Sequence, residues 1–250
     1  MKNFTNRLYT YWMAFVFVTG FVVTSILFYP FLLSKKTYKI VHLGNRVFAY
    51  WVFILSGIPV VREWRFKRNK RQVYMYCANH TSYIDIPTFF LTVPTFFNII
   101  GKSELRKLPL FGYMFHKLYI SVNRRSKMGR YESYQKVLGS IMSSRSMCFF
   151  PEGTIPPYRQ MPALFPFKDG AFRAAIEKQI SIVPITIPYN WIILGDNGNK
   201  TVAKWHPCKV IFHEPISTVG KTDKDLSEIK SQVYDVIDQE LKKIFPNGSK

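Results

Sequence analysis

The 250-residue sequence is poor in acidic residues and in cysteine. Asp and Glu together number 15 against 35 Lys and Arg, which gives a formal net charge of +20 at pH 7. Such an excess predicts an anionic partner, whether nucleic acid, an anionic lipid surface or a phosphorylated substrate. The three cysteines, Cys77, Cys148 and Cys208, form no CxxC pair and no zinc pattern, so the sequence indicates neither a disulfide framework nor a metal site. We expect buried thiols in a reducing compartment.

Several other signals are also missing. We find no GxxxxGK phosphate loop, no GxGxxG fingerprint, no GxSxG elbow, no internal repeat and no low-complexity linker. Hydrophobic residues make up 48% of the chain, which excludes a disordered protein. The length predicts one domain with an appendage, or two small domains.

Charge is absent from Leu8 to Ser34, a stretch of 27 residues. This exceeds the roughly 20 residues that cross a bilayer as a helix. A cleaved signal peptide is the alternative, but the stretch is long and has no A-x-A-like cleavage site, so we expect it to be retained. Gly20 and Pro30 permit a kink, so the segment either spans the bilayer or enters one leaflet and returns.

A second uncharged stretch covers residues 47–61, and a basic run with six Lys or Arg in ten follows at residues 62–71. The stretch is short for a span and predicts either an interfacial or re-entrant helix or a buried core helix. The basic run is typical of a solvated face or a nucleic-acid patch, but its place beside apolar segments favours an anionic lipid surface. We therefore divide the chain into a membrane-associated helical region, residues 1–71, and a second domain, residues 72–250.

Flanking charge predicts the orientation of the chain if the first segment spans the membrane. Four basic residues follow it and two precede it, which places the remainder of the chain on the cytoplasmic face. The four are Lys35, Lys36, Lys39 and Arg46, and the two are Lys2 and Arg7.

Beyond residue 71, short apolar runs alternate with helical patterns. The alternation predicts an α/β fold with a mostly parallel, buried sheet flanked by helices. The predicted strands are 72–78, 95–100, 118–122, 146–150, 180–187 and a late one within 205–216. The predicted helices are 86–92, 109–117, 129–143, 169–178 and a closing helix over 226–244, with Thr222 and Asp225 as its capping pair.

Polar residues follow several of these strands, where sites form in parallel sheets. His80 ends the first strand, and Asp85 lies five positions on; a carboxylate partner would orient the imidazole if the chain turns before the helix. The alternative is that Ser82 caps the helix with Asp85 as its partner and His80 is structural.

Three further strand ends carry charge. Lys102 follows the second strand, Arg124 and Arg125 follow the third, and Glu152 with Gly153 follows the fourth. Each alone is consistent with surface charge or a polar turn, but together they favour one convergent site.

Ordered motifs resemble the glycerolipid acyltransferase family, specifically 1-acylglycerol-3-phosphate acyltransferases of the PlsC type. The blocks that carry the resemblance are NHTSYID at 79–85, GKSELRKLPLFG at 101–112, FPEGT at 150–154, FKDGA at 167–171 and IVPITI at 182–187. The resemblance covers roughly residues 76–187 and implies acyl transfer from a thioester to a lipid hydroxyl.

The resemblance also implies roles for individual residues. His80 would be the general base and Asp85 its orienting partner. Lys102 and Arg124 would hold the acceptor phosphate, and the segment from Glu152 through Gly153 to Thr154 would help place the acceptor. Pro184 would shape the site wall.

One departure concerns the residues after FPEGT. Many relatives have Arg there, whereas this chain has Ile155-Pro156-Pro157 and its nearest arginine is Arg159. Either Arg159 folds back to the phosphate, or other cations bind it, or the acceptor lacks it.

Three functional hypotheses follow. The first is a membrane-bound enzyme that makes phosphatidic acid from lysophosphatidic acid and acyl-CoA or acyl-carrier protein, without a metal or redox cofactor. The second keeps the chemistry but uses another lysophospholipid or a lyso amino-acid lipid. The third is a non-catalytic protein that binds membranes or nucleic acid, although the uncharged segment argues against nucleic acid as the main partner.

Overall fold

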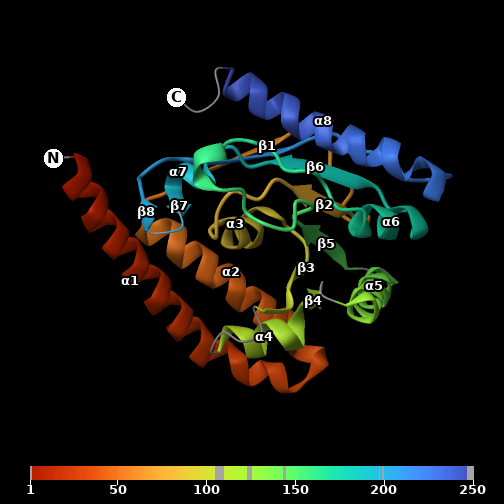
Figure 1. Cartoon of the computed structure of the whole chain (residues 1–250). Helices are drawn as coiled ribbons and strands as arrows, with labels where there is room; N and C mark the ends of the chain where they lie inside the picture. The colour runs from red at the N-terminus through yellow and green to blue at the C-terminus, as the bar shows by residue number, and fades with distance from the viewer. Residues whose placement is uncertain are drawn as a thin grey trace.

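A seven-stranded sheet forms the centre of the computed structural model, which describes residues 2–104, 110–122, 126–142, 145–196, 198 and 200–246 (Figure 1). The strand order is β1-β9-β6-β2-β5-β3-β4, and neighbours are parallel except for the antiparallel pair of β6 and β9. This confirms the predicted α/β fold. The strand bounds are β1 Val60–Trp64, β2 Met75–Ala78, β3 Phe97–Lys102, β4 Ile120–Val122, β5 Ser146–Phe149, β6 Ile182–Thr186 and β9 Cys208–Phe212.

Helices cover both faces of the sheet (Figure 1). Because side chains alternate along a strand, Tyr76 and Ala78 of β2 join the core on the side of α2, α3 and α4, whereas Met75 and Cys77 join the core on the side of α5, α6 and α8. The α-helices are α1 Lys2–Phe28, α2 Tyr38–Leu55, α3 Asp85–Thr92, α4 Phe111–Leu118, α5 Lys127–Met142, α6 Gly170–Glu177, α7 Asn190–Ile193 and α8 Leu226–Ile244.

Strand β1 comes from the region that we assigned to the membrane-associated part. It pairs with β9, and Trp64 stacks on Phe212 with ring centroids 3.8 Å apart. The aromatic side chain of Trp64 in the basic run is therefore part of the core and does not face a lipid surface. The uncharged stretch 47–61 is split between the end of α2 and the start of β1. The division after residue 71 stays a prediction, but the sheet takes one strand from before it.

Helix α1 lies against α2 and the body. Tyr9 Oη donates to the carbonyl of Ser56 at 2.7 Å, Trp12 Nε1 donates to the carbonyl of Leu55 at 2.9 Å, and Thr10 Oγ1 accepts from the amide of Ala203. The apolar segment Phe4–Leu33 is long enough to cross a membrane by length and composition, and only 28% of its most apolar window is buried within the protein. Most of that window therefore faces outward.

The closing helix α8 begins as predicted. Thr222 and Asp225 form a capping box, but it caps the short 3-10 helix Asp223–Asp225 that leads directly into α8; in it the carboxylate of Asp225 accepts from the amide of Thr222 at 2.8 Å. The helix then buries Ile229, Val233 and Ile237 against the sheet. A short hairpin that we did not predict, β7 Leu194–Asp196 and β8 Thr201–Ala203, lies beside α1.

Candidate active site

The loop between β2 and α3 brings His80 and Asp85 together. His80 Nδ1 lies 2.8 Å from Asp85 Oδ2, and the Asp85 side chain is fully buried. Because a carboxylate only accepts hydrogen bonds, the proton of the neutral imidazole belongs on Nδ1. Nε2 is then an unprotonated base, and no residue that the structure describes hydrogen-bonds to it. The predicted turn of the chain between the two residues is present.

Asp85 is held by several donors. Its Oδ2 also accepts from the amides of Thr81 at 2.7 Å and Ser82 at 2.9 Å, and its Oδ1 accepts from Asn190 Nδ2 at 2.7 Å. The alternative role of Ser82 as the helix cap is wrong, because α3 begins at Asp85 and the Ser82 hydroxyl donates to the carbonyl of Leu194. These bonds fix the carboxylate that orients His80.

Glu152 joins two loops at the carboxyl edge of the sheet. One carboxylate oxygen accepts from the amide of His80 at 2.7 Å, and the other accepts from the amide of Phe165 at 2.8 Å. Burial raises the pKa of Glu152 to about 8, and these two hydrogen bonds oppose the shift. Since both oxygens have backbone donors, the geometry favours positioning of the His80 backbone over direct contact with an acceptor.

An aromatic stack fixes the plane of the imidazole. The ring of His80 lies on Phe150 with centroids 4.0 Å apart, and Phe150 stacks in turn on Phe89. The His80 side chain keeps 16% of its surface exposed, at a cavity of about 480 Å³ that it lines together with Thr154 and Arg159. The catalytic base of the predicted dyad is thus reachable by a small molecule.

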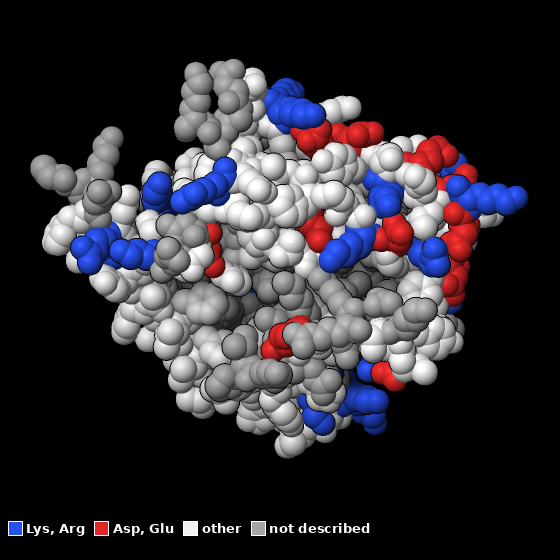
Figure 2. Space-filling model, viewed as in Figure 1, with Lys and Arg blue, Asp and Glu red and all other residues white. Residues whose placement is uncertain are grey.

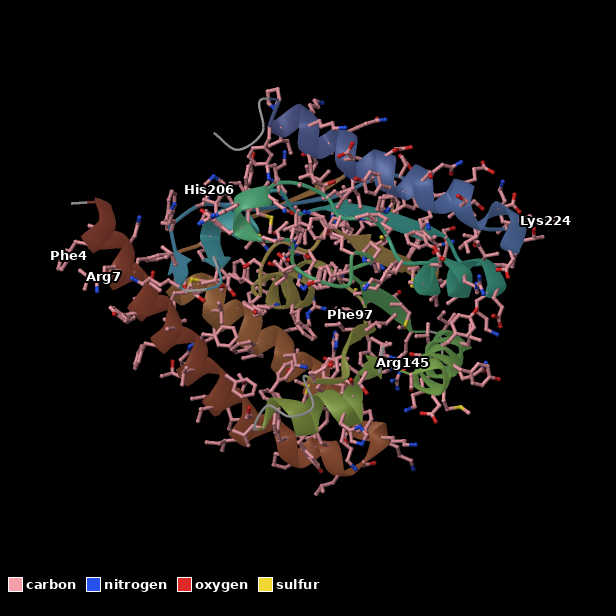
Figure 3. The ribbon with its side chains drawn as sticks, viewed as in Figure 1. Phe4, Arg7, Phe97, Arg145, His206 and Lys224 are labelled. Atoms are coloured by element: carbon pink, nitrogen blue, oxygen red, sulfur yellow. The ribbon has the colours of Figure 1, made fainter. Side chains whose placement is uncertain are left out.

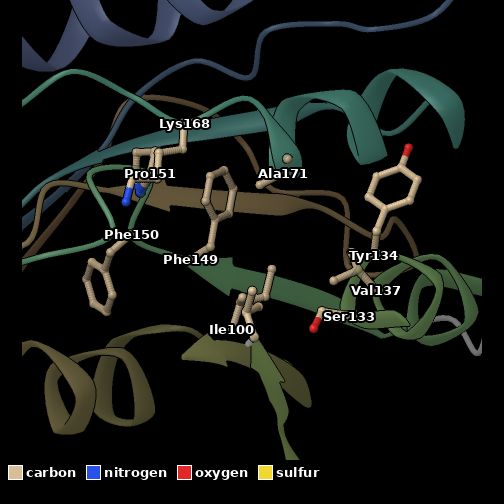
Figure 4. A pocket seen from close by; sticks show the side chains of 12 residues that line it. Ile100, Ser133, Tyr134, Val137, Phe149, Phe150, Pro151, Lys168 and Ala171 are labelled. Carbon is tan, nitrogen blue, oxygen red and sulfur yellow. The ribbon is translucent and has the colours of Figure 1, made fainter. Parts of the chain in front are cut away.

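Two more cavities adjoin this one. An apolar cavity of about 400 Å³ lies among α1, α2, α3 and α4 and shares Tyr83, Ile86 and Phe115 with the first. Another, of about 370 Å³, lies between β5, α5 and α6, where Figure 4 shows Phe149 turned toward Ala171 and Phe150 turned the other way. The cavity at His80 therefore has an apolar cavity beside it that is large enough for hydrocarbon.

The structure places the other predicted site residues as follows. Gly153, with φ of +71°, lines both the first and the third cavity, and a left-handed backbone of this kind favours glycine. Lys102 ends β3 opposite Val122, and its side chain and the whole of Arg124 lie outside the described residues. Pro184 lies within β6, paired with Cys77, and lines none of these three cavities, so its role as a site wall stays a prediction.

Two asparagines were missed. Asn190 Nδ2 bridges Asp85 and Thr88, and Asn79 makes two hydrogen bonds to the backbone of Ile187 that tie the ends of β2 and β6 together. Asn190 follows a predicted strand end, so the rule that led to His80 also applies to it.

The chain belongs to the acyltransferase family, because the family model for acyltransferases matches residues 60–188. The chain is 26% identical to a 1-acyl-sn-glycerol-3-phosphate acyltransferase of Haemophilus influenzae, over 78% of this chain and 80% of that protein. It is also 26% identical to a chloroplastic 1-acyl-sn-glycerol-3-phosphate acyltransferase of Arabidopsis thaliana, over 66% of this chain but only 45% of that longer protein.

One solved structure has the same fold over its whole length. The crystal structure of the 1-acyl-sn-glycerophosphate acyltransferase PlsC from Thermotoga maritima superposes with a TM-score of 0.75, with 100% of both chains covered and 22% identity. That likeness extends the shared fold to the two N-terminal helices.

Proposed function

We propose that the protein is a membrane-attached 1-acyl-sn-glycerol-3-phosphate acyltransferase, which makes phosphatidic acid from lysophosphatidic acid and an acyl thioester. The observation that carries the proposal is the His80–Asp85 dyad, whose imidazole lines a cavity that adjoins an apolar one. The names of the Haemophilus influenzae and Arabidopsis thaliana relatives agree with it.

In the proposed reaction, His80 Nε2 takes the proton of the acceptor hydroxyl as its oxygen attacks the thioester carbonyl carbon. Asp85 keeps the proton on Nδ1 and stabilises the imidazolium that forms. When the carbon–sulfur bond breaks, the imidazolium returns the proton to the leaving thiolate. The products are an ester and a free thiol of coenzyme A or of acyl-carrier protein.

Recognition of the acceptor phosphate falls to cations at the first cavity. Of the described residues that line this cavity, Arg159 alone is a Lys or Arg. This supports the idea that Arg159 takes the place of the arginine that is absent after FPEGT. Lys102 and Arg124, which end or follow neighbouring parallel strands, remain proposed phosphate ligands. Thr154 and Gly153 would contact the acceptor, and Glu152 would act through the backbone of His80.

Attachment to one leaflet fits the contacts of α1 better than a bilayer span. Thr10 near one end contacts β8, and Phe21 nearer the other end contacts Phe111 of α4, so the helix lies along the body. A helix that crossed the bilayer would draw the body into hydrocarbon. The basic residues around the turn between α1 and α2 favour the anionic cytoplasmic leaflet.

A transfer assay tests this function. The protein in neutral detergent is given radiolabelled acyl-CoA or acyl-carrier protein with lysophosphatidic acid, and His80→Ala is expected to lose activity by at least about 100-fold. His206→Ala is the matched control, because His206, which is labelled in Figure 3, does not line any of the three cavities around the dyad. Normal turnover in His80→Ala would exclude the assigned base.

A second acceptor class has one observation in its favour. Ile155 and Pro156 line the first cavity where an arginine would bring charge. If zwitterionic lysophospholipids or lyso amino-acid lipids are acylated in a His80-dependent way while lysophosphatidic acid is not, the chemistry stands and the acceptor is replaced.

A further inference from the structure

A cationic cavity lies at the opposite edge of the sheet from His80. It has a volume of about 340 Å³ and is lined near the start of β5 by Arg145 and Ser146, near the start of β3 by Thr95 and Phe96, and by three more cations from elsewhere in the chain. Those three are Lys39 in the first turn of α2, and Lys70 and Arg71 in the loop before β2. Four positive side chains from three separate segments thus converge on one hollow.

The charges in this hollow are not balanced by the protein. No acidic residue lines it, and none of its four cations forms an ion pair within the part of the chain that the structure describes. By contrast, Arg65 in the same basic run binds both Glu63 and Glu240. Four like charges around one cavity repel each other unless an anion lies between them.

The floor of the cavity is built from partly buried groups. The Arg145 guanidinium lies over the ring of Phe96, 4.6 Å from its centroid, which holds this long side chain in place. Thr95 lines the cavity, and its Oγ1 is buried next to the hydroxyl of the fully buried Tyr76. An acceptor in the cavity would complete the hydrogen bonding of Thr95.

The position of Lys39 indicates where the anion comes from. On α2, Ile40, Leu43 and Val47 are exposed and apolar, and they belong to the face that we propose to lie on the bilayer. The cavity therefore opens next to that face, at the depth where lipid phosphates lie. The two guanidinium and two ammonium groups of this cavity are the usual partners of phosphate oxygens.

We propose that this cavity binds the phosphate of an anionic phospholipid head group. The site is distinct from the one at His80 and holds the body in a defined orientation on the membrane. The inference depends on the proposed membrane attachment but not on the proposed acyl transfer.

The test measures binding of the full-length protein to vesicles of phosphatidylcholine alone and of phosphatidylcholine with phosphatidylglycerol. Phosphatidylglycerol is neither substrate nor product of the proposed reaction, so the catalytic cavity does not contribute. The measurement is made at about 1 M salt, where the Debye length is only about 3 Å and diffuse surface attraction is screened. The cavity variant is Lys39→Gln with Arg145→Gln, and the matched control is Lys35→Gln with Lys36→Gln, which removes the same charge from the adjacent turn.

We expect wild type and the turn control to keep at least a threefold preference for the anionic vesicles, and the cavity variant to lose it. Binding to neutral vesicles and acyl transfer in neutral detergent should be unchanged in all three. If loss of Arg145 impairs folding, Lys70→Gln with Arg71→Gln tests the same cavity through two exposed side chains.

Two outcomes would overturn the proposal. Equal behaviour of the cavity variant and the turn control would mean diffuse surface charge without a site. Equal binding of wild type to the neutral and the anionic vesicles, together with binding of inorganic phosphate that the cavity variant loses, would mean a site for soluble phosphates and not for lipid. Failure of acyl transfer in wild type would refute the proposed function and leave this result intact.

Discussion

The outermost helices on the two faces of the sheet differ in what they present to their surroundings. The outer side of α1 exposes large apolar side chains, among them Leu8, Phe15 and Ile26. The outer side of α8 is charged and contains ion pairs such as Lys242 with Asp238. Figure 2 shows acidic and basic side chains together over the end of α8 that lies at the right of the view.

The inner sides of the same helices are alike. Met13 and Val16 of α1 are buried as completely as Val233 and Ile237 of α8. Both helices therefore meet the same requirement for a packed core, and the difference lies only in the medium outside. An apolar outer face that water would disfavour agrees with the proposed membrane attachment through α1 and α2.

The largest effect is expected from charges on the outer side of α1. Leu8→Glu with Phe15→Glu should lower binding to neutral phosphatidylcholine vesicles by at least about a hundredfold, because each buried side chain of this size contributes about 1.5–3 kcal/mol. Co-flotation with vesicles measures it. Ser231→Glu with Gln239→Glu adds the same charge to the exposed side of α8 and should leave binding unchanged. An equal loss of vesicle binding in the two double variants would mean that α1 and α8 do not differ in their contact with lipid.

The second largest effect is expected at the His80–Asp85 dyad, which lies in the body covered by α1 and α2. Asn190→Ala removes the donor to Asp85 Oδ1. We expect kcat to fall about tenfold with little change in KM. The free energy of unfolding should fall by about 1–3 kcal/mol, because a buried acceptor is left without a partner. Steady-state transfer kinetics and thermal unfolding measure the two. Asn98→Ala is the control, since Asn98 is buried and hydrogen-bonded to Ser140 away from the site. It should lower stability alone, and an equal kcat loss there would refute the positioning role.

Glycine substitutions compare the inner contacts of the helices. A Cβ at Gly20 of α1 would lie 2.5 Å from Trp51 Cδ1 of α2, whereas a Cβ at Gly139 of α5 would meet no atom within 4 Å. Gly20→Ala should therefore destabilise the protein by about 1–3 kcal/mol through overpacking. Gly139→Ala should stabilise it by about 0.5–1 kcal/mol, because alanine is the better helix former. Thermal unfolding in detergent measures both, and stabilisation by Gly20→Ala would show that the helices do not pack this closely.

The smallest effect is a pH dependence of stability that arises from His213, on the inner side of α8. His213 accepts a hydrogen bond from Arg65 and donates one to Thr186, and burial, with the charge of Arg65, lowers its pKa to about 4. The unfolded chain, with a pKa near 6.5, binds the proton first, so stability is lost as pH falls from about 6.5 toward 4.

His213→Gln keeps both hydrogen bonds without the titration, so the decline of about 1 kcal/mol over the first pH unit below 6.5 should disappear from its unfolding curves. His206→Gln removes a histidine outside this network and should keep the decline. An unchanged slope in His213→Gln would assign the pH dependence to other groups.

Much of the fold could be predicted from local pattern. Apolar runs flanked by helical spacing marked β2, β3, β5 and β6, and the capping pair marked the start of α8. Strand β1 was missed because VVREW carries charge and its partner β9 lies about 150 residues on. Pairing at such separation leaves no local signature.

The sequence by itself determined the α/β class, the apolar N-terminal segment and the identity of the dyad, because periodicity, composition and motif spacing are local properties of the chain. Only the tertiary structure decided that Asn190 completes the support of Asp85 and that α1 lies along the body. It also decided that four cations from separate segments share one cavity. These depend on contacts between residues far apart in the chain, which packing creates and no local pattern encodes.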